Sequence, residues 1–377
     1  QSLGAKSFPP PYLAPNTEAQ AILRGINYAS GASGIMDKTG FFFIGRIPLG
    51  EQVSNFEQNR IYMVNAMGEN YTRKFLRKAI FSLTIGSNDV LNYIQPSIPF
   101  LRHDKVSPST FLDFMISNLT LQLERLHEMG ARKFIVVGVG PLGCIPFVRA
   151  LKLLGSGQCS SAVNTLIQAY NHRLKELLSR LNQEMGPETI FVFANSYDVF
   201  MDIIANYHQY GLENANDPCC GGYFPPFVCF KSSDANTSAL CDDRSKYVFW
   251  DAYHPTEAAN LIIAKQLVDG NENVSFPINI RKLYNYNNSY FKGDLLTFNG
   301  NEFATRNYRG HGWVSICMGR SWSRGWVLYG FFKAFLAVEL IWAIGLQVNP
   351  GLESNSMGFV LMLSGLQTNL KDITMGP

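Results

Sequence analysis

The sequence predicts a doubly wound parallel α/β fold, because short β-branched runs alternate with long helical patterns over its first 288 residues. Residues 133–143, KFIVVGVGPLG, form an almost continuous apolar run, as expected for a strand that is buried on both faces. The helical patterns open with Ser or Pro and close with Gly. Ligand sites in such sheets form at the carboxyl ends of the strands, so we expect the chemistry in the turns that follow them.

Four strands and three helices are predicted in order along the chain. The strands are expected within residues 25–30, 79–89, 133–143 and 189–197. The helices are expected within residues 107–130, 160–186 and 255–270. Ser107 is the predicted N-cap of the first helix, with Pro108 at its first position. The third helix is expected to begin at Pro255 and to end at Gly270.

The overall composition is that of a globular protein without a strong charge. The chain has 377 residues, of which 46% are hydrophobic and 16% charged, and its formal net charge is +3. Such a length leaves room for one large domain and a further segment. The small charge argues against nucleic acid or an anionic membrane surface as a partner and favours small neutral molecules.

The cysteines and glycosylation sequons indicate an oxidising compartment. Cys144 and Cys159 bracket one loop, four more cysteines lie between residues 219 and 241, and Cys317 is left over. Loops closed by disulfides are typical of secreted proteins. N-x-[S/T] sequons, where N-glycans are expected, point the same way, although each is common by chance; they lie at Asn70, Asn118, Asn236, Asn273 and Asn287.

No metal or cofactor is expected. The cysteines form no C-x-x-C pair, and the six histidines show neither H-E-x-x-H nor H-x-H spacing. The glycine-containing stretch NYASGASGI, residues 27–35, has no G-x-G-x-x-G pattern, so it does not predict a dinucleotide site.

Two turns after predicted strands hold candidate oxyanion donors. In LTIGSND, residues 83–89, the side-chain amide of Asn88 can donate to a developing oxyanion. The alternative is an ordinary Asn/Asp turn, since both residues are favoured there. In NYASGASGI, Gly31 lets the backbone approach a ligand closely, so that its N–H can serve as a second donor. The alternative is a loop that needs a positive φ.

The stretch WDAYHP, residues 250–255, holds the candidate base. A carboxylate at Asp251 can reach the ring N–H of His254 and fix its tautomer, so that the other ring nitrogen accepts a proton. The alternatives are a polar turn before a helix, or a metal site that would need further ligands.

The order of these motifs resembles that of the SGNH hydrolase superfamily and, more closely, the plant GDSL esterase/lipase family. The likeness runs from residue 1 to about 288 and includes GINYASGASGI, FSLTIGSND, VVGVGPLGCIP, NDPCCGG and KYVFWDAYHPTEAAN. It implies a three-layer flavodoxin-like fold and secreted proteins that hydrolyse small-molecule or lipid carboxylic esters without a cofactor. It assigns Gly31 and Asn88 to the oxyanion hole, His254 to the base and Asp251 to the residue that orients it.

The sequence departs from this family at the nucleophile. The family's serine lies in an F-G-D-S block at the end of the first strand, and the sequence holds no G-D-S tripeptide. We therefore expect the first strand and its serine to be missing and the chain to be inactive. In a sheet of order 2-1-3-4-5 this strand is interior, so its neighbours would be left with unpaired backbone groups. The alternative functions are a pseudoenzyme that retains the pocket and a pseudogene product.

The sequence changes character after residue 288, which divides a hydrolase domain, 1–288, from a tail, 289–377. Residues 327–348 are a 22-residue apolar stretch, but Lys333 and Glu339 interrupt it, so no stable membrane span is expected. Residues 319–344 faintly resemble the ribonuclease H-like region of plant retroelements. Only Glu339 matches an acidic site residue there, so the tail is assigned no activity.

Overall fold

The computed structural model describes residues 3–4, 7–14, 19–41, 43, 45–95, 106–151, 158–222, 229, 240–286 and 313–317. All of them belong to one compact unit, Gln1–Trp322. Apart from residues 313–317, the range 289–377 lies outside the described residues, as does the apolar stretch 327–348. The tail's separate origin and its likeness to a ribonuclease H-like region therefore stay predictions.

The unit is built on a six-stranded sheet of order β1-β8-β2-β3-β4-β7. The strands are, in that order, β1 (Gly25–Asn27), β8 (Trp313–Cys317), β2 (Ile80–Thr84), β3 (Lys133–Val137), β4 (Ile190–Ala194) and β7 (Ser275–Phe276). The first five run parallel, and β7 is antiparallel to β4. The predicted parallel α/β class is thus confirmed, and each of the four predicted strands is present within its expected range.

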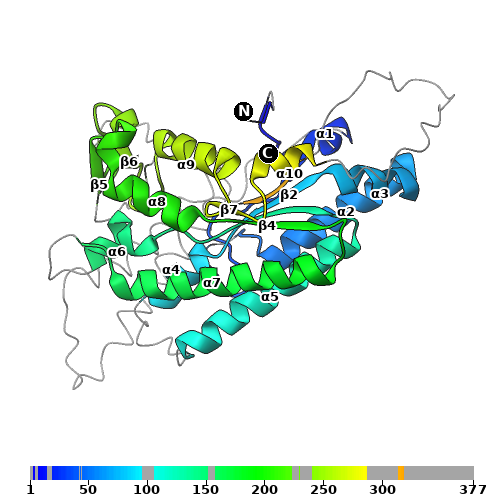
Figure 1. Ribbon diagram of the computed structural model, residues 1–377, viewed down its shortest axis with the longest axis horizontal. Helices are drawn as coiled ribbons and strands as arrows, with labels where there is room; N and C mark the ends of the chain where they lie inside the picture. Colours follow the sequence, from blue (N-terminus) through cyan, green and yellow to red (C-terminus); the bar gives the residue numbers. More distant parts are fainter. Residues whose placement is uncertain are drawn as a thin grey trace, which may run out of the picture. The chain divides into compact units, whose positions relative to one another are not determined.

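Helices cover both faces of this sheet, which gives three layers (Figure 1). One face carries α2 (Leu49–Met67), α5 (Pro108–Glu128) and α7 (Ser161–Glu184); the other carries α8 (Ser196–Ala205), α9 (Glu257–Asp269) and α10 (Ile280–Asn285). Shorter helices are α1 (Ala19–Arg24), α3 (Glu69–Lys78), α4 (Ser87–Ile94) and α6 (Pro146–Leu151). This arrangement matches the three-layer architecture expected from the family resemblance.

Two helix starts show how closely local sequence sets the boundaries. Ser107 caps α5 as predicted, since its hydroxyl accepts a hydrogen bond from the N–H of Thr110 at 3.2 Å. The prediction that the last long helix begins at Pro255 is wrong by two residues. The helix α9 begins at Glu257, because the Thr256 hydroxyl caps it by accepting from the N–H of Ala259 at 3.1 Å. Pro255 instead forms an antiparallel bridge with Phe249.

An aromatic row crosses the middle of the sheet. Phe81, Phe134 and Phe191 lie in register on β2, β3 and β4, and all three are fully buried. Their ring centroids are 5.8 Å and 4.3 Å apart along the row. Phe56 of α2 packs edge-on against Phe81 at 5.2 Å. Each such pair contributes about 0.5–1.5 kcal/mol beyond the burial of its area, so the row fixes the register of the three strands.

The strand β8 fills the interior position between β1 and β2, which we expected from the sequence to be empty. It pairs in parallel with β1 on one side and with β2 on the other. The neighbours of the interior position therefore have a hydrogen-bonding partner, in contrast to the open edge expected from the sequence. The partner comes from beyond residue 288, in the range that we assigned to the tail.

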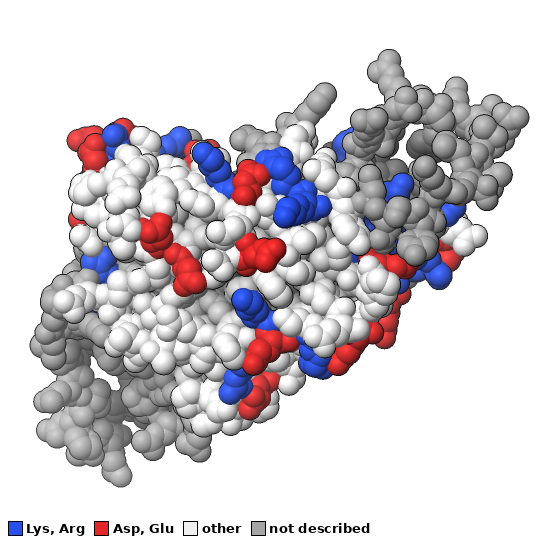
Figure 2. All heavy atoms as spheres, viewed as in Figure 1, with Lys and Arg blue, Asp and Glu red and all other residues white. Residues whose placement is uncertain are grey.

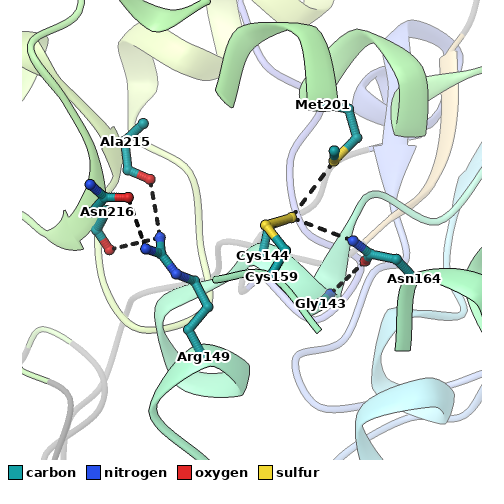
Figure 3. The surroundings of a disulfide bond; sticks show 8 residues. All are labelled: Gly143, Cys144, Arg149, Cys159, Asn164, Met201, Ala215 and Asn216. Atoms are coloured by element: carbon teal, nitrogen blue, oxygen red, sulfur yellow. Dashed lines mark hydrogen bonds between the residues drawn. A yellow bond between two sulfur atoms is a disulfide. The ribbon is translucent and has the colours of Figure 1, made fainter. Parts of the chain in front are cut away.

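A second, two-stranded sheet of β5 (Asn214–Pro218) and β6 (Tyr247–Phe249) is tied to the main unit through α6. A guanidinium nitrogen of Arg149 on α6 donates to the Asn216 side-chain oxygen at 2.8 Å and another to the carbonyl of Ala215 at 3.4 Å (Figure 3). The N–H of Phe147 donates to the carbonyl of Ala252 at 2.9 Å. Because α6 follows the loop after β3, the segment beyond β6 is held near the carboxyl end of the sheet.

Three disulfides close loops of this unit, as the clustering of cysteines predicted. They join Cys144 to Cys159, Cys219 to Cys241 and Cys220 to Cys229. Figure 3 shows the first, where the Cys144 sulfur also lies 3.5 Å from the Asn164 amide and 3.6 Å from the Met201 sulfur. The second and third staple the loop before β6.

Within the described part of the chain, no helix is both long and apolar enough to cross a bilayer. On the face drawn in Figure 2, basic and acidic side chains are interspersed, and the described residues form no broad basic patch there.

Candidate active site

Asp251 and His254 form a close acid–imidazole pair on the loop between β6 and α9. Both carboxylate oxygens of Asp251 lie 2.9 Å from Nδ1 of His254. The same Oδ1 accepts the backbone N–H groups of Tyr253 and His254, each at 2.8 Å. A carboxylate fixed in this way holds the proton on Nδ1, so Nε2 is left with its lone pair free to accept a proton.

The loop itself is rigidly closed. The carbonyl of His254 accepts the N–H of Trp250 at 2.7 Å, and Thr256 donates its N–H back to the carbonyl of Val248 at 2.9 Å. Its hydroxyl also donates to the carbonyl of Tyr247 at 2.7 Å. The rings of Tyr253 and Phe147 pack at 4.7 Å. These contacts fix the backbone of the pair before any ligand binds.

Burial divides the two members of the pair. The Asp251 side chain is only 4% exposed, whereas that of His254 is 53% exposed. Among the described residues, Nε2 of His254 has no hydrogen-bond partner. A buried acid behind an exposed imidazole is the arrangement expected of a base that faces a substrate.

Asn88 lies in the first turn of α4 rather than in a plain turn after the strand. Gly86 precedes this helix with φ of 117°, a conformation that favours glycine and that turns the chain sharply out of β2. The Asn88 amide nitrogen donates to the carbonyl of Ser33 at 2.8 Å. Its second N–H has no partner among the residues described here, so it is available to a ligand.

Asp89, the next residue, anchors the loop that approaches Asn88. It is fully buried, and its carboxylate accepts the N–H groups of Ile35 at 2.9 Å and Met36 at 3.1 Å, and the hydroxyl of Thr39 at 2.6 Å. Burial raises the pKa of Asp89 above its usual range, while these hydrogen bonds act in the opposite direction. The local sequence predicts only a turn at Asp89 and not this role, because the partners lie some fifty residues away in the chain.

Gly31 lies on the exposed turn that ends in this anchored loop. A Cβ added at Gly31 would meet nothing within 4 Å, so the backbone there is open to a ligand. The following residue, Ala32, has φ of 60°, which is uncommon for a residue with a side chain. Gly34 is different, because an added Cβ would lie 2.5 Å from both carboxylate oxygens of Asp89. The close approach, and not a positive φ, requires glycine at position 34.

The four predicted site residues fall into two groups at one edge of the sheet. Asp251 and His254 form the first, and Asn88 joins the Gly31 turn through Ser33 to form the second. The turns that carry Gly31 and Asn88 follow the carboxyl ends of β1 and β2. The loop that carries Asp251 and His254 is connected through α6 to the end of β3. Within the described residues no hydrogen bond connects the two groups. A substrate would have to span them.

Two rival kinds of site find little support. Residues 138–143, GVGPLG, do match the glycine pattern of dinucleotide sites. However, the N–H groups of Val139 and Gly143 are taken by the side chains of Asn171 and Asn164, at 2.8 and 2.9 Å, so they cannot cradle a pyrophosphate. The described residues hold no group of three or more His, Cys, Asp or Glu that could bind a metal ion.

An oriented imidazole and an amide donor at the ends of parallel strands are groups that acyl-transferring hydrolases use. The chain belongs to the GDSL-like lipase/acylhydrolase family, whose model matches residues 2–267. It is 61% identical over 287 residues to GDSL esterase/lipase At5g41890 of Arabidopsis thaliana, covering 75% of this chain and 78% of that protein. It is 45% identical over 292 residues to GDSL esterase/lipase At4g16230 of the same plant, covering 76% and 77%. The resemblance inferred from the motifs is thereby confirmed.

Proposed function

We propose that this site is built to hydrolyse carboxylic esters of small molecules or lipids, with His254 as the general base and Asp251 as the residue that orients it. Asn88 Nδ2 and the Gly31 N–H are the oxyanion donors. Membership of the GDSL family supports ester hydrolysis in general. The observation that carries the assignment is the Asp251 carboxylate held against Nδ1 of His254, whose side chain is half exposed and whose Nε2 has no partner among the described residues.

In the reaction we propose, a serine hydroxyl attacks the ester carbonyl and passes its proton to Nε2 of His254. The carbonyl oxygen becomes an oxyanion that accepts hydrogen bonds from Asn88 and Gly31, and the imidazolium returns the proton to the departing alkoxide. A water molecule then repeats the sequence on the acyl-serine and releases the acid. No cofactor enters any of these steps.

We further propose that this chain lacks the serine and hydrolyses esters poorly on its own. Its 377 residues contain no G-D-S tripeptide, and no serine among the described residues bonds to the His254 ring. Without a nucleophile, oriented donors and substrate binding leave only residual catalysis.

The test is hydrolysis of p-nitrophenyl butyrate by the purified full-length chain and by its His254→Ala variant. We expect equal rates for the two proteins, both near the rate without protein. A rate that falls in His254→Ala would support the role of the base and would contradict the absence of a nucleophile.

Nε2 of His254, which has no partner in the part of the chain that the structure describes, also favours a second candidate, a non-catalytic protein that binds an ester or acyl ligand at the retained site. Binding to the folded state raises the melting temperature by mass action. A rise with increasing p-nitrophenyl butyrate that is reduced by Asn88→Ala, without hydrolysis, would favour this second candidate. No rise with any ester would oppose both.

Secretion and N-glycosylation are also proposed. The three disulfides fit an oxidising compartment. Of the five sequons, Asn70 and Asn273 are exposed and Asn118 is partly exposed on α5, so glycans could attach there; Asn236 and Asn287 lie outside the described residues. Mass spectrometry of the plant-expressed protein before and after peptide N-glycosidase tests each position.

A further inference from the structure

We propose that residues Trp313–Cys317, from the C-terminal part of the chain, serve as the interior strand that completes the hydrolase sheet. The inference goes beyond the proposed function, and neither of its tests needs ester hydrolysis. It starts from the order of the sheet, in which the last strand of the sequence lies between the first and the second, parallel to both.

Three positions of β8 pair with residues of the same polarity on the neighbouring strands. Val314 is in register with Ile26 and Phe81, which are both buried. Ile316 is in register with the buried Leu83. The one hydroxyl residue of the strand, Ser315, is in register with Asn27 and Ser82. A shift by one residue would place Ser315 beside apolar partners, so the pattern selects this register.

The strand also meets a strong backbone requirement. Ile80, Phe81 and Leu83 of β2 are completely buried in the structure that contains β8, so this edge of β2 lies inside the sheet. Backbone N–H and C=O groups on this edge of β2, together with those on β1, would lose their strand partner if β8 were absent. The sheet therefore depends on the strand that fills the interior position.

The same strand defines one boundary of the candidate site. Cys317, the last residue of β8, is in register with Thr84, the last residue of β2. Gly86 and Asn88 follow Thr84 directly, and the Gly31 turn follows β1 on the other side. The carboxyl end of β8 thus lies between the two turns that carry the proposed oxyanion donors.

The first experiment uses this register to trap the strand. The other six cysteines of the chain are paired in the three disulfides, so Cys317 is the one thiol left for a new bond. Neighbouring strands lie about 4.7–4.9 Å apart, within the range that a disulfide spans. We expect Thr84→Cys in the full-length chain to form a disulfide with Cys317 under mild oxidation, detected as a cross-linked peptide.

The matched control is Thr120→Cys on α5, away from this strand, which should give no cross-link to Cys317. The proposal is overturned if Thr84→Cys leaves both thiols free while the three native disulfides form, or if the control cross-links equally well.

The second experiment measures hydrogen exchange in the full-length chain. Val314→Pro removes a backbone donor from the strand, whereas Val314→Ile keeps both the donor and the β-branched side chain. We expect the amides of Ile80–Thr84 to exchange at least about tenfold faster in Val314→Pro than in the wild type or Val314→Ile. Unchanged protection of these amides in Val314→Pro would overturn the proposal. Loss of protection throughout the sheet, with Val314→Ile intact, would support it.

Discussion

Asp251 contacts the His254 ring through both carboxylate oxygens, and one of them also accepts two backbone hydrogen bonds. Its Oδ1 accepts the N–H groups of Tyr253 and His254 at 2.8 Å, while both Oδ1 and Oδ2 lie 2.9 Å from Nδ1 of the ring. The carboxylate therefore cannot rotate without losing two backbone hydrogen bonds. The tautomer of the histidine is determined by the fold of its own loop.

Asp251→Asn should reverse that tautomer. The amide oxygen will keep the two backbone N–H donors, which leaves the NH₂ group facing Nδ1 and forces that nitrogen to become an acceptor. We expect the neutral ring to change from the Nδ1–H to the Nε2–H form, visible in its ¹⁵N chemical shifts at pH 8. Glu257→Gln, which neutralises a carboxylate three residues beyond the histidine, is the control and should leave the tautomer unchanged. An unaltered tautomer in Asp251→Asn would contradict the orienting role.

Gly34→Ala should destabilise the protein, whereas Gly31→Ala should not. The new Cβ at position 34 would lie 2.5 Å from the Asp89 carboxylate and from the Thr39 methyl, so the anchored loop must shift. We expect a loss of about 1–3 kcal/mol in the free energy of unfolding. At position 31 the space is open, and a change within about 0.5 kcal/mol is expected. Urea unfolding of both variants measures the difference; equal stabilities would refute the close packing of this loop.

Lys133→Met should stabilise the protein near neutral pH. Burial, followed by the nearby charge of Lys78, lowers the pKa of Lys133 from 10.5 to about 8. The ammonium is thus disfavoured in the folded state, and this cost is fully present below pH 8. Between about pH 8 and 10.5 the unfolded chain binds more protons than the folded one, so stability rises with pH.

Methionine removes both the cost and this rise with pH. We expect a gain of about 1 kcal/mol at pH 7. Thermal unfolding at pH 7 and pH 10 measures it. If the stability of the wild type falls from pH 8 to 10 by as much as that of Lys133→Met, this lysine is not destabilising.

Removal of the Cys144–Cys159 disulfide should weaken the fold. The bond closes a loop of 15 residues directly after β3. In the chain-entropy account, such a loop contributes about 3 kcal/mol by restricting the unfolded chain. We expect the Cys144→Ser, Cys159→Ser double variant to lose about that much in urea unfolding under oxidising conditions. Under full reduction it should differ little from the wild type, and a persistent difference there would point to packing at these positions instead.

The sequence predicted best what depends on neighbouring residues. The Asp251–His254 contact spans three residues of one loop, and the four predicted strands are short β-branched runs, so local patterns were sufficient for both. The hydrogen bond from Asn88 to Ser33 joins residues 55 positions apart, and the anchoring of the 35–39 loop by Asp89 has a similar span. Nothing in a local pattern indicates such pairs.

The same reasoning explains why β8 was missed. Trp313–Cys317 is a short strand within a range that does not continue the α/β alternation, so no periodic context marked it. Its partners in β1 and β2 lie more than 220 residues away in the chain. The strand is recognised only when its apolar and polar residues are compared with the residues in register on β1 and β2.

We propose that this chain carries the base, its orienting acid and the oxyanion donors of a GDSL hydrolase without the serine nucleophile. Serine-directed fluorophosphonate labelling of the full-length protein, followed by peptide mapping, tests it most directly. The account predicts no covalent adduct on any serine in either the wild type or His254→Ala. A serine adduct that forms in the wild type and not in His254→Ala would contradict it and would identify the nucleophile.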